Sequence, residues 1–106
     1  MFKTSHRYAK SLIEFSVKRN LLEVIYKDII LVNSVFKNNK DLVFMLNNPL
    51  IYNSKKLRIL EKVFYAKISN LTFSFFDLVI KKKRSYILSN ILEVFINEYK
   101  IIISSI

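Results

Sequence analysis

The stretch from His6 to Val17, HRYAKSLIEFSV, decides the fold. Its apolar and small residues form two rows at helical spacing, one position apart: Tyr8, Leu12 and Phe15, then Ala9, Ile13 and Ser16. This spacing predicts a helix with an apolar stripe more than about 100° wide. A short helix of this kind is not stable alone, because most helical stability comes from packing. The rest of the chain must supply helical partners, or leave part of the stripe for another protein.

Composition favours one helical domain spanning residues 1–106. The chain contains no Gly and one Pro, whereas sheets need Gly-containing turns at regular spacing. The absence of Cys excludes disulfides and thiolate metal sites. We find no secretory signal, and the longest apolar run, Leu71 to Ile80, is too short to cross a bilayer core of about 30 Å. The chain is therefore expected to be soluble, or at most to lie on a membrane surface.

Periodicity predicts an all-α fold, a compact six-helix bundle with short antiparallel connections. The expected helices are residues 5–19, 21–37, 40–47, 53–64, 71–80 and 85–102. Asn20 and Asn39 are expected to cap the helices that follow them. The connector Pro49, Leu50 and Ile51 is expected to place its apolar side chains in the core. The positions expected to face solvent include the acidic residues Glu14, Glu23, Asp28 and Glu61, and Lys55, Lys56, Arg58 and Lys62 in the fourth helix.

No group of polar residues suggests catalysis. The single histidine, His6, lies beside Arg7 with no nearby carboxylate, so we expect it to be solvated. There is no Gly-rich phosphate loop, HExxH motif or pair of carboxylates at a catalytic spacing. We therefore predict no catalytic residue, no bound metal and no cofactor.

The basic run Lys81, Lys82, Lys83 and Arg84 is a possible electrostatic patch, in a chain whose net charge is +10. Such a patch supplies phosphate affinity, which makes a small nucleic-acid-binding protein the alternative function. A lipid-binding bundle is a third possibility. However, cations in a last helical turn also suit the helix dipole, and no recognition-helix pattern is present, so nucleic acid is an improbable partner.

The first and fifth predicted helices carry apolar residues around more than one face. In the fifth, Phe73 and Phe76 need cover in addition to the row of Leu71, Phe75 and Leu78. The ordinary interpretation is a protein core. If the bundle cannot cover both helices, the remainder is a groove for a partner's amphipathic helix.

The order and spacing of several motifs resemble a known family. They are Arg7-Tyr8-Ala9 with Leu12, the connector Leu46-Asn47-Asn48-Pro49-Leu50-Ile51, Lys55-Lys56 with Leu60, Leu71-Thr72 with Phe75, Leu78 and Arg84, and finally Ile91, Phe95 and Tyr99. Together they resemble the N-terminal domain of the F-type ATP synthase delta subunit, the family of the mitochondrial oligomycin-sensitivity-conferring protein. The resemblance extends over nearly the whole chain.

The resemblance implies a non-catalytic module of the peripheral stalk, or stator, of a proton-translocating ATP synthase. It would bind N-terminal helices of alpha subunits and keep the catalytic head from turning with the rotor. The groove it implies lies between the first and fifth helices. Its lining, carried over by position, is Tyr8, Ala9, Leu12, Phe75, Leu78 and Val79. The implied location is peripheral, on the cytoplasmic face of a bacterial inner membrane.

This sequence departs from the family pattern in two ways. Lys83 stands where the family usually has Gly before the residue matched by Arg84, so the turn must form without an easy positive-φ residue. The family's C-terminal part, which contacts the b subunit of the stalk, has no counterpart after Ile106. The expectation is a truncated or reduced chain that holds the head but does not complete the tether alone.

Overall fold

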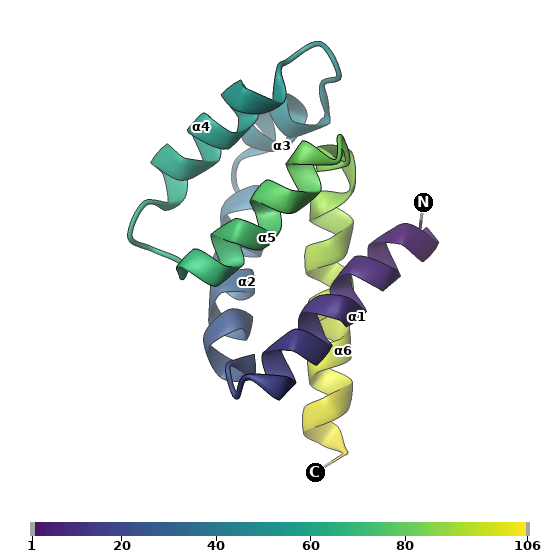
Figure 1. The fold of residues 1–106 in the computed structure, drawn as a ribbon. Helices are drawn as coiled ribbons and strands as arrows, with labels where there is room; N and C mark the ends of the chain where they lie inside the picture. The colour runs from purple at the N-terminus through teal and green to yellow at the C-terminus, as the bar shows by residue number, and fades with distance from the viewer. Residues whose placement is uncertain (1, 106) are drawn as a thin grey trace.

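The computed structural model describes residues 2–105, and within them all regular structure is helical (Figure 1). Its elements are α1 (Phe2–Lys18), α2 (Leu22–Lys37), α3 (Lys40–Asn47), α4 (Asn53–Phe64), α5 (Asn70–Lys81), the short 3₁₀ turn η1 (Ser85–Ile87) and α6 (Leu88–Ser104). The predicted all-α class is confirmed, and the predicted boundaries hold to within a few residues. None of these helices is long and apolar enough to cross a membrane.

Helix α6 makes the most extensive helix-to-helix packing of the bundle. Helices α1 and α2 both pack along it, while α5 packs against α4 and α2 (Figure 1). The small residues Ser5, Ala9 and Ser16 of α1 are fully buried, which lets α1 approach its neighbours closely. The largest wholly buried side chains include Phe64, Phe76 and Phe95. The core therefore joins α4, α5 and α6 with one face of α1 and α2.

Three helices are followed by a left-handed residue that is not glycine: Asn20 after α1, Ala66 after α4 and Lys83 after α5. After α5, the Arg84 amide donates to the Val79 carbonyl and the Lys83 amide to that of Ile80, while Lys83 has φ 62°. This pair of bonds is the Schellman motif, whose left-handed position usually carries Gly. Lys83 thus forms the turn despite its Cβ, at a cost of about 1 kcal/mol.

Asn20 plays the same part after α1, which corrects its predicted role. Its φ is 56°, and the next amide, that of Leu21, donates to the Ser16 carbonyl. It therefore closes α1 and does not cap α2, whose first turn has no side-chain cap. The other predicted cap, Asn39, is confirmed, because its side chain accepts from the Leu42 amide.

The connector before α4 does not fill the core as predicted. Leu50 is 87% exposed, and only Ile51 of the three apolar residues is half-buried. The Asn48 side chain accepts from the Leu50 amide, and this local turn directs the leucine outward.

Two charged residues predicted to face solvent are buried. Asp28 of α2 receives three hydrogen bonds on one carboxylate oxygen: from the Ser69 amide (3.0 Å), the Ser69 hydroxyl (2.8 Å) and the Thr72 hydroxyl (2.7 Å). Since Ser69 is the N-cap of α5, Asp28 fixes the start of α5 against α2. Lys56 of α4 is only 4% exposed. In both cases a long-range polar partner, invisible to helical periodicity, outweighs the preference of the charge for water.

Candidate functional site

Helix α5 turns an apolar row outward. Leu71 and Leu78 are 39% and 47% exposed, and Phe75 between them is half-buried. These positions are spaced i, i+4 and i+7, so they share one face of the helix. The adjacent face, with Phe76, Val79 and Ile80, is fully buried. A helix held firmly by one face therefore presents a second apolar face.

Tyr8 of α1 meets this row at its centre. The Tyr8 and Phe75 rings lie edge to face, with centroids 6.2 Å apart. Arg84, just past the end of α5, donates from Nη1 to the Tyr8 hydroxyl at 2.8 Å, and its guanidinium carbon lies 5.6 Å from the ring centroid. Phe75 also contacts buried Phe76, which connects the surface rings to the core. Tyr8 is consequently fixed from two sides while remaining partly accessible.

The residues predicted to line a groove divide into two sets. Tyr8, Phe75 and Leu78 reach the surface, whereas Ala9, Leu12 and Val79 are at most 5% exposed and belong to the core. Ala9 and Val79 each lie one position beyond an accessible residue, Tyr8 and Leu78, whereas Leu12 belongs to the same row as Tyr8 and is nevertheless buried. Helical periodicity therefore identifies the apolar positions of a helix but does not show which of them remain accessible to solvent.

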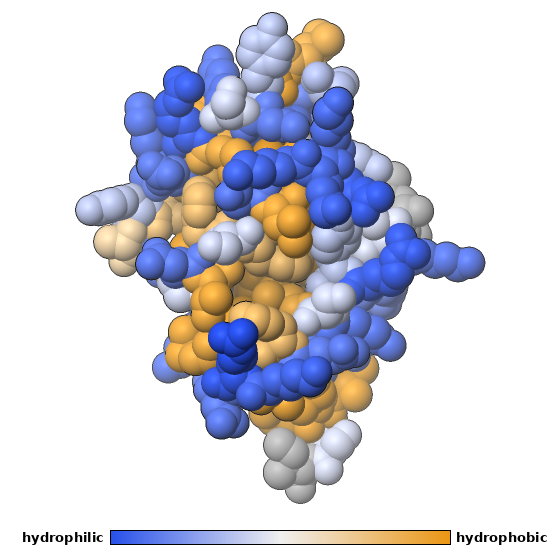
Figure 2. Space-filling view, in the orientation of Figure 1, coloured by the Kyte–Doolittle hydropathy of each residue, from blue (hydrophilic) through white to orange (hydrophobic). Residues whose placement is uncertain are grey.

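Two further residues complete the accessible rows. Phe15 follows Tyr8 by seven positions and is half-buried, with the Arg19 guanidinium stacked 4.8 Å from its ring centroid. Leu71 begins the row on α5. We call the surface formed by Tyr8, Phe15, Leu71, Phe75 and Leu78 the α1/α5 surface. Figure 2 shows apolar side chains gathered in a shallow hollow between these two helices, bordered by hydrophilic ones.

The four cations of the basic run at the end of α5 have different neighbours. Lys81 forms an ion pair with Asp77 at 3.2 Å, and Arg84 lies against Tyr8. Lys83 lines a pocket, leaving Lys82 as a plain exposed cation. The four neighbouring cations thus have four different surroundings.

The outer face of α1 carries a separate group of cations. Lys3, His6, Arg7 and Lys10 line a shallow depression of about 450 Å³. His6 is exposed, as predicted. Among residues 2–105, no group of three or more His, Cys, Asp or Glu side chains is arranged to hold a metal ion. Lys3, Arg7 and Lys10 add positive charge to the part of α1 that carries Tyr8.

Comparison with known proteins gives a consistent result. The family model described as ATP synthase delta (OSCP) subunit matches residues 4–101. The chain is 37% identical over 99 residues to the ATP synthase subunit delta of Amoebophilus asiaticus, which covers 93% of this chain and 54% of that protein. It is 36% identical over 98 residues to the protein of the same name from Cytophaga hutchinsonii, covering 92% and 54%. The chain thus spans about half the length of these curated relatives. None of these matches is named as a nucleic-acid-binding protein.

Proposed function

This chain belongs to the ATP synthase delta (OSCP) subunit family, and from that premise we propose that it is a non-catalytic stator module of an F-type ATP synthase. In this proposal the α1/α5 surface binds an N-terminal helix of an alpha subunit. The single observation that supports it best is the accessible apolar row of α5 beside the partly accessible Tyr8 and Phe15. The role is mechanical: the bundle holds the catalytic head against torque from the rotor.

The α1/α5 surface suits an amphipathic helix. Its two apolar rows and the hollow between them would receive side chains at i, i+3, i+4 and i+7 of the partner. Leu78 and Leu71 would lose their remaining exposure, and each Å² of apolar area removed from water contributes about 25 cal/mol before ordering costs are subtracted. Tyr8 and Phe75 already contact each other, so little side-chain entropy is lost when they bind.

Charge favours an acidic partner. Arg7 and Lys10 lie on the outer face of α1, and Lys82 is exposed at the far end of α5. These cations would steer an acidic helix toward the α1/α5 surface and raise the association rate more than the final affinity.

Location follows from the same proposal. The module would be a peripheral member of a membrane-bound complex, on the cytoplasmic face of a bacterial inner membrane. Contact with the b subunit of the stalk would be made through the C-terminal part of the family, which residues 1–106 do not include. In this proposal the bundle binds the catalytic head, and the C-terminal part of the family binds the stalk.

Leu78→Asp tests the proposal. A carboxylate within the interface loses the leucine contact and must be desolvated, so affinity for a synthetic alpha N-terminal peptide should fall about 100-fold. Isothermal titration calorimetry measures the affinity, and circular dichroism checks that the bundle stays helical.

Leu50→Asp is the matched control, because Leu50 is 87% exposed and lies outside the α1/α5 surface. It should bind the peptide as tightly as the wild-type chain. Equal affinity for the Leu78→Asp and wild-type proteins would exclude the α1/α5 surface as the binding site.

A further inference from the structure

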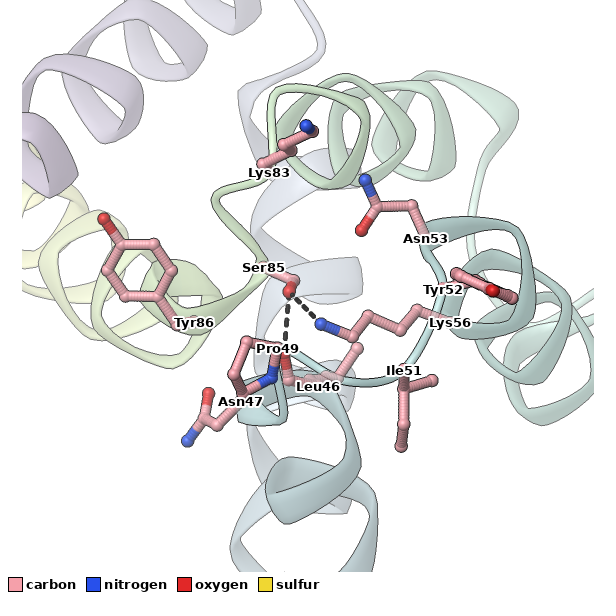
Figure 3. A pocket seen from close by; sticks show the side chains of 10 residues that line it. All are labelled: Leu46, Asn47, Pro49, Ile51, Tyr52, Asn53, Lys56, Lys83, Ser85 and Tyr86. Atoms are coloured by element: carbon pink, nitrogen blue, oxygen red, sulfur yellow. Dashed lines mark hydrogen bonds between the residues drawn. The ribbon is translucent and has the colours of Figure 1, made fainter.

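A pocket of about 630 Å³ lies at the other side of the turn that follows α5. Its walls come from the connector between α3 and α4, the first turns of α4 and residues 83–86 (Figure 3). Leu46, Pro49 and Ile51 supply apolar wall, and Tyr52 and Tyr86 are exposed aromatic residues of its lining. This volume falls in the range of small-molecule sites.

The Lys56 ammonium is the charged centre of the pocket. Lys56 is 4% exposed, and its Nζ donates to the Ser85 hydroxyl oxygen at 3.0 Å. Ser85 in turn donates its one proton to the Leu46 carbonyl at 2.6 Å. The serine therefore accepts from the lysine, and it orients the ammonium without neutralising it.

This ammonium lacks a counter-charge. An ammonium has three donors, and only the bond to Ser85 uses one of them. Within residues 2–105 the sole salt bridge is that between Lys81 and Asp77, so no carboxylate pairs with Lys56. Burial accordingly lowers the pKa of Lys56 from its ordinary value. Buried charges are normally paired, so an unpaired ammonium that borders a cavity is suited to bind an anion that enters the cavity.

Two more lining residues can bind an anion. Lys83 contributes a second cation from the turn after α5, at a left-handed position that glycine would fit better. Asn53, at the first position of α4, adds a side-chain amide. Figure 3 shows Lys83 and Asn53 on one side of the space that the Lys56 side chain crosses.

We propose that this pocket binds a small organic anion through a phosphate or carboxylate group held by Lys56, Lys83 and Asn53. The apolar wall and the tyrosines would contact the rest of the molecule, because the volume exceeds that of a free oxyanion. Phosphate is the better match of the two groups, since two lysines neutralise a dianion. The site is independent of peptide binding at the α1/α5 surface.

Titration calorimetry on the whole chain tests the proposal with three probes at matched ionic strength: inorganic phosphate, acetate and phenyl phosphate. We expect saturable binding with phenyl phosphate tightest and acetate weakest. Lys56→Met should weaken phenyl phosphate binding by about tenfold or more, since it removes the central charge but keeps the stem. Lys55→Met, an exposed neighbour on the same helix, is the matched control and should bind as the wild type does.

Lys83→Gly separates function from folding. It should weaken binding by about threefold or more through the lost cation, while raising the melting temperature because glycine suits the left-handed turn. If acetate binds as tightly as phosphate, the carboxylate form of the proposal is the correct one.

Two results would overturn the proposal. One is the absence of saturable binding for all three probes, and the other is unchanged affinity in Lys56→Met. Should that variant fail to fold, an NMR titration of the wild-type protein that follows the side-chain amide resonance of Asn53 tests the proposal instead. This resonance must shift on addition of phenyl phosphate, and a response confined to residues outside the pocket rejects the proposal.

Discussion

Asp28 and Lys56 are both buried charges on helices, yet their surroundings differ. One oxygen of the Asp28 carboxylate accepts from the Ser69 amide, the Ser69 hydroxyl and the Thr72 hydroxyl. The Lys56 ammonium has one partner, the Ser85 hydroxyl, and a pocket of about 630 Å³ beside it. The protein itself supplies the hydrogen bonds of the Asp28 carboxylate, whereas two donors of the Lys56 ammonium have no protein partner in the part of the chain that the structure describes.

This difference separates a structural charge from a binding charge. Asp28 lies at the N-terminus of α5, where the amide dipoles also favour an anion, and it sets the position of the helix that carries Leu71, Phe75 and Leu78. Removing it should damage the fold. Lys56 organises little besides Ser85, so removing its charge should leave the fold intact.

Asp28→Ala should have the largest effect on stability. Hydrogen bonds to a charged acceptor are worth about 1.5 to 3 kcal/mol each but are not additive, so we expect a loss of about 3 kcal/mol in the free energy of unfolding. For a domain of this size that corresponds to a fall of roughly 15 °C in melting temperature. Urea unfolding followed by circular dichroism measures it.

Glu61→Ala is the control for this change, since Glu61 is exposed on α4 and its loss should stay within about 0.5 kcal/mol. A loss no greater for Asp28→Ala than for Glu61→Ala would show that the network does not hold α5 in place. Asp28 could then no longer be contrasted with Lys56 as a charge that stabilises the fold.

Lys56→Met should change stability by no more than about 1 kcal/mol, because buried charges are often replaced by apolar residues of similar size without loss. The pKa of Lys56 is lowered in the folded state, by burial, so the unfolded chain binds more protons between that pKa and the ordinary value of about 10.5. The wild type should therefore gain stability relative to Lys56→Met as the pH rises through this window.

Urea unfolding at several pH values measures this difference. A loss for Lys56→Met as large as that for Asp28→Ala would make both charges structural and remove the contrast between them. A difference that does not vary with pH would show that the folded protein does not disfavour the charged lysine.

Most of the fold could be predicted from the local spacing of residues in the sequence. The rows of α1, α2 and α5 and the breaks at Asn39 and Pro49 are visible in the sequence because helical period and capping are short-range properties. The apolar faces of α1 and α5 were predicted in the same way, and Tyr8, Phe75 and Leu78 reach the surface. What spacing does not give is the depth at which each residue lies, so Ala9, Leu12 and Val79 were assigned to the same lining.

The pocket was beyond the sequence. Lys56 and Ser85 are 29 positions apart, and Asp28 and Thr72 are 44 apart, so nothing local distinguishes these charges from solvated ones. The left-handed turn at Lys83 was also hidden, since a lysine gives no sign of positive φ. These features depend on how α4 packs against α5 and how η1 meets α3, which only the assembled bundle shows.

The smallest effect at neutral pH should come from a third polar pair, the accessible one between α6 and α2. The Tyr99 hydroxyl donates to the Glu23 carboxylate, and the Tyr99 ring stacks on Tyr26 with centroids 3.5 Å apart. The hydrogen bond to Glu23, followed by desolvation, raises the pKa of Tyr99 to about 12. An unfolded tyrosine titrates near 10, so folding favours the neutral phenol.

The contribution of Tyr99 should therefore be constant below about pH 10 and disappear as the pH rises through about 12. Tyr99→Phe should remove the latest step in the phenolate absorbance titration of the folded protein, whereas Tyr65→Phe, at a position 79% exposed, should leave that step in place. Because both members of the pair are reached by water, the variant should unfold in urea nearly as the wild type does at neutral pH. If Tyr99→Phe were as destabilising as Asp28→Ala, solvent exposure would not predict how much a polar contact stabilises this fold. The distinction between Asp28 and Lys56 would then rest only on the pocket beside Lys56.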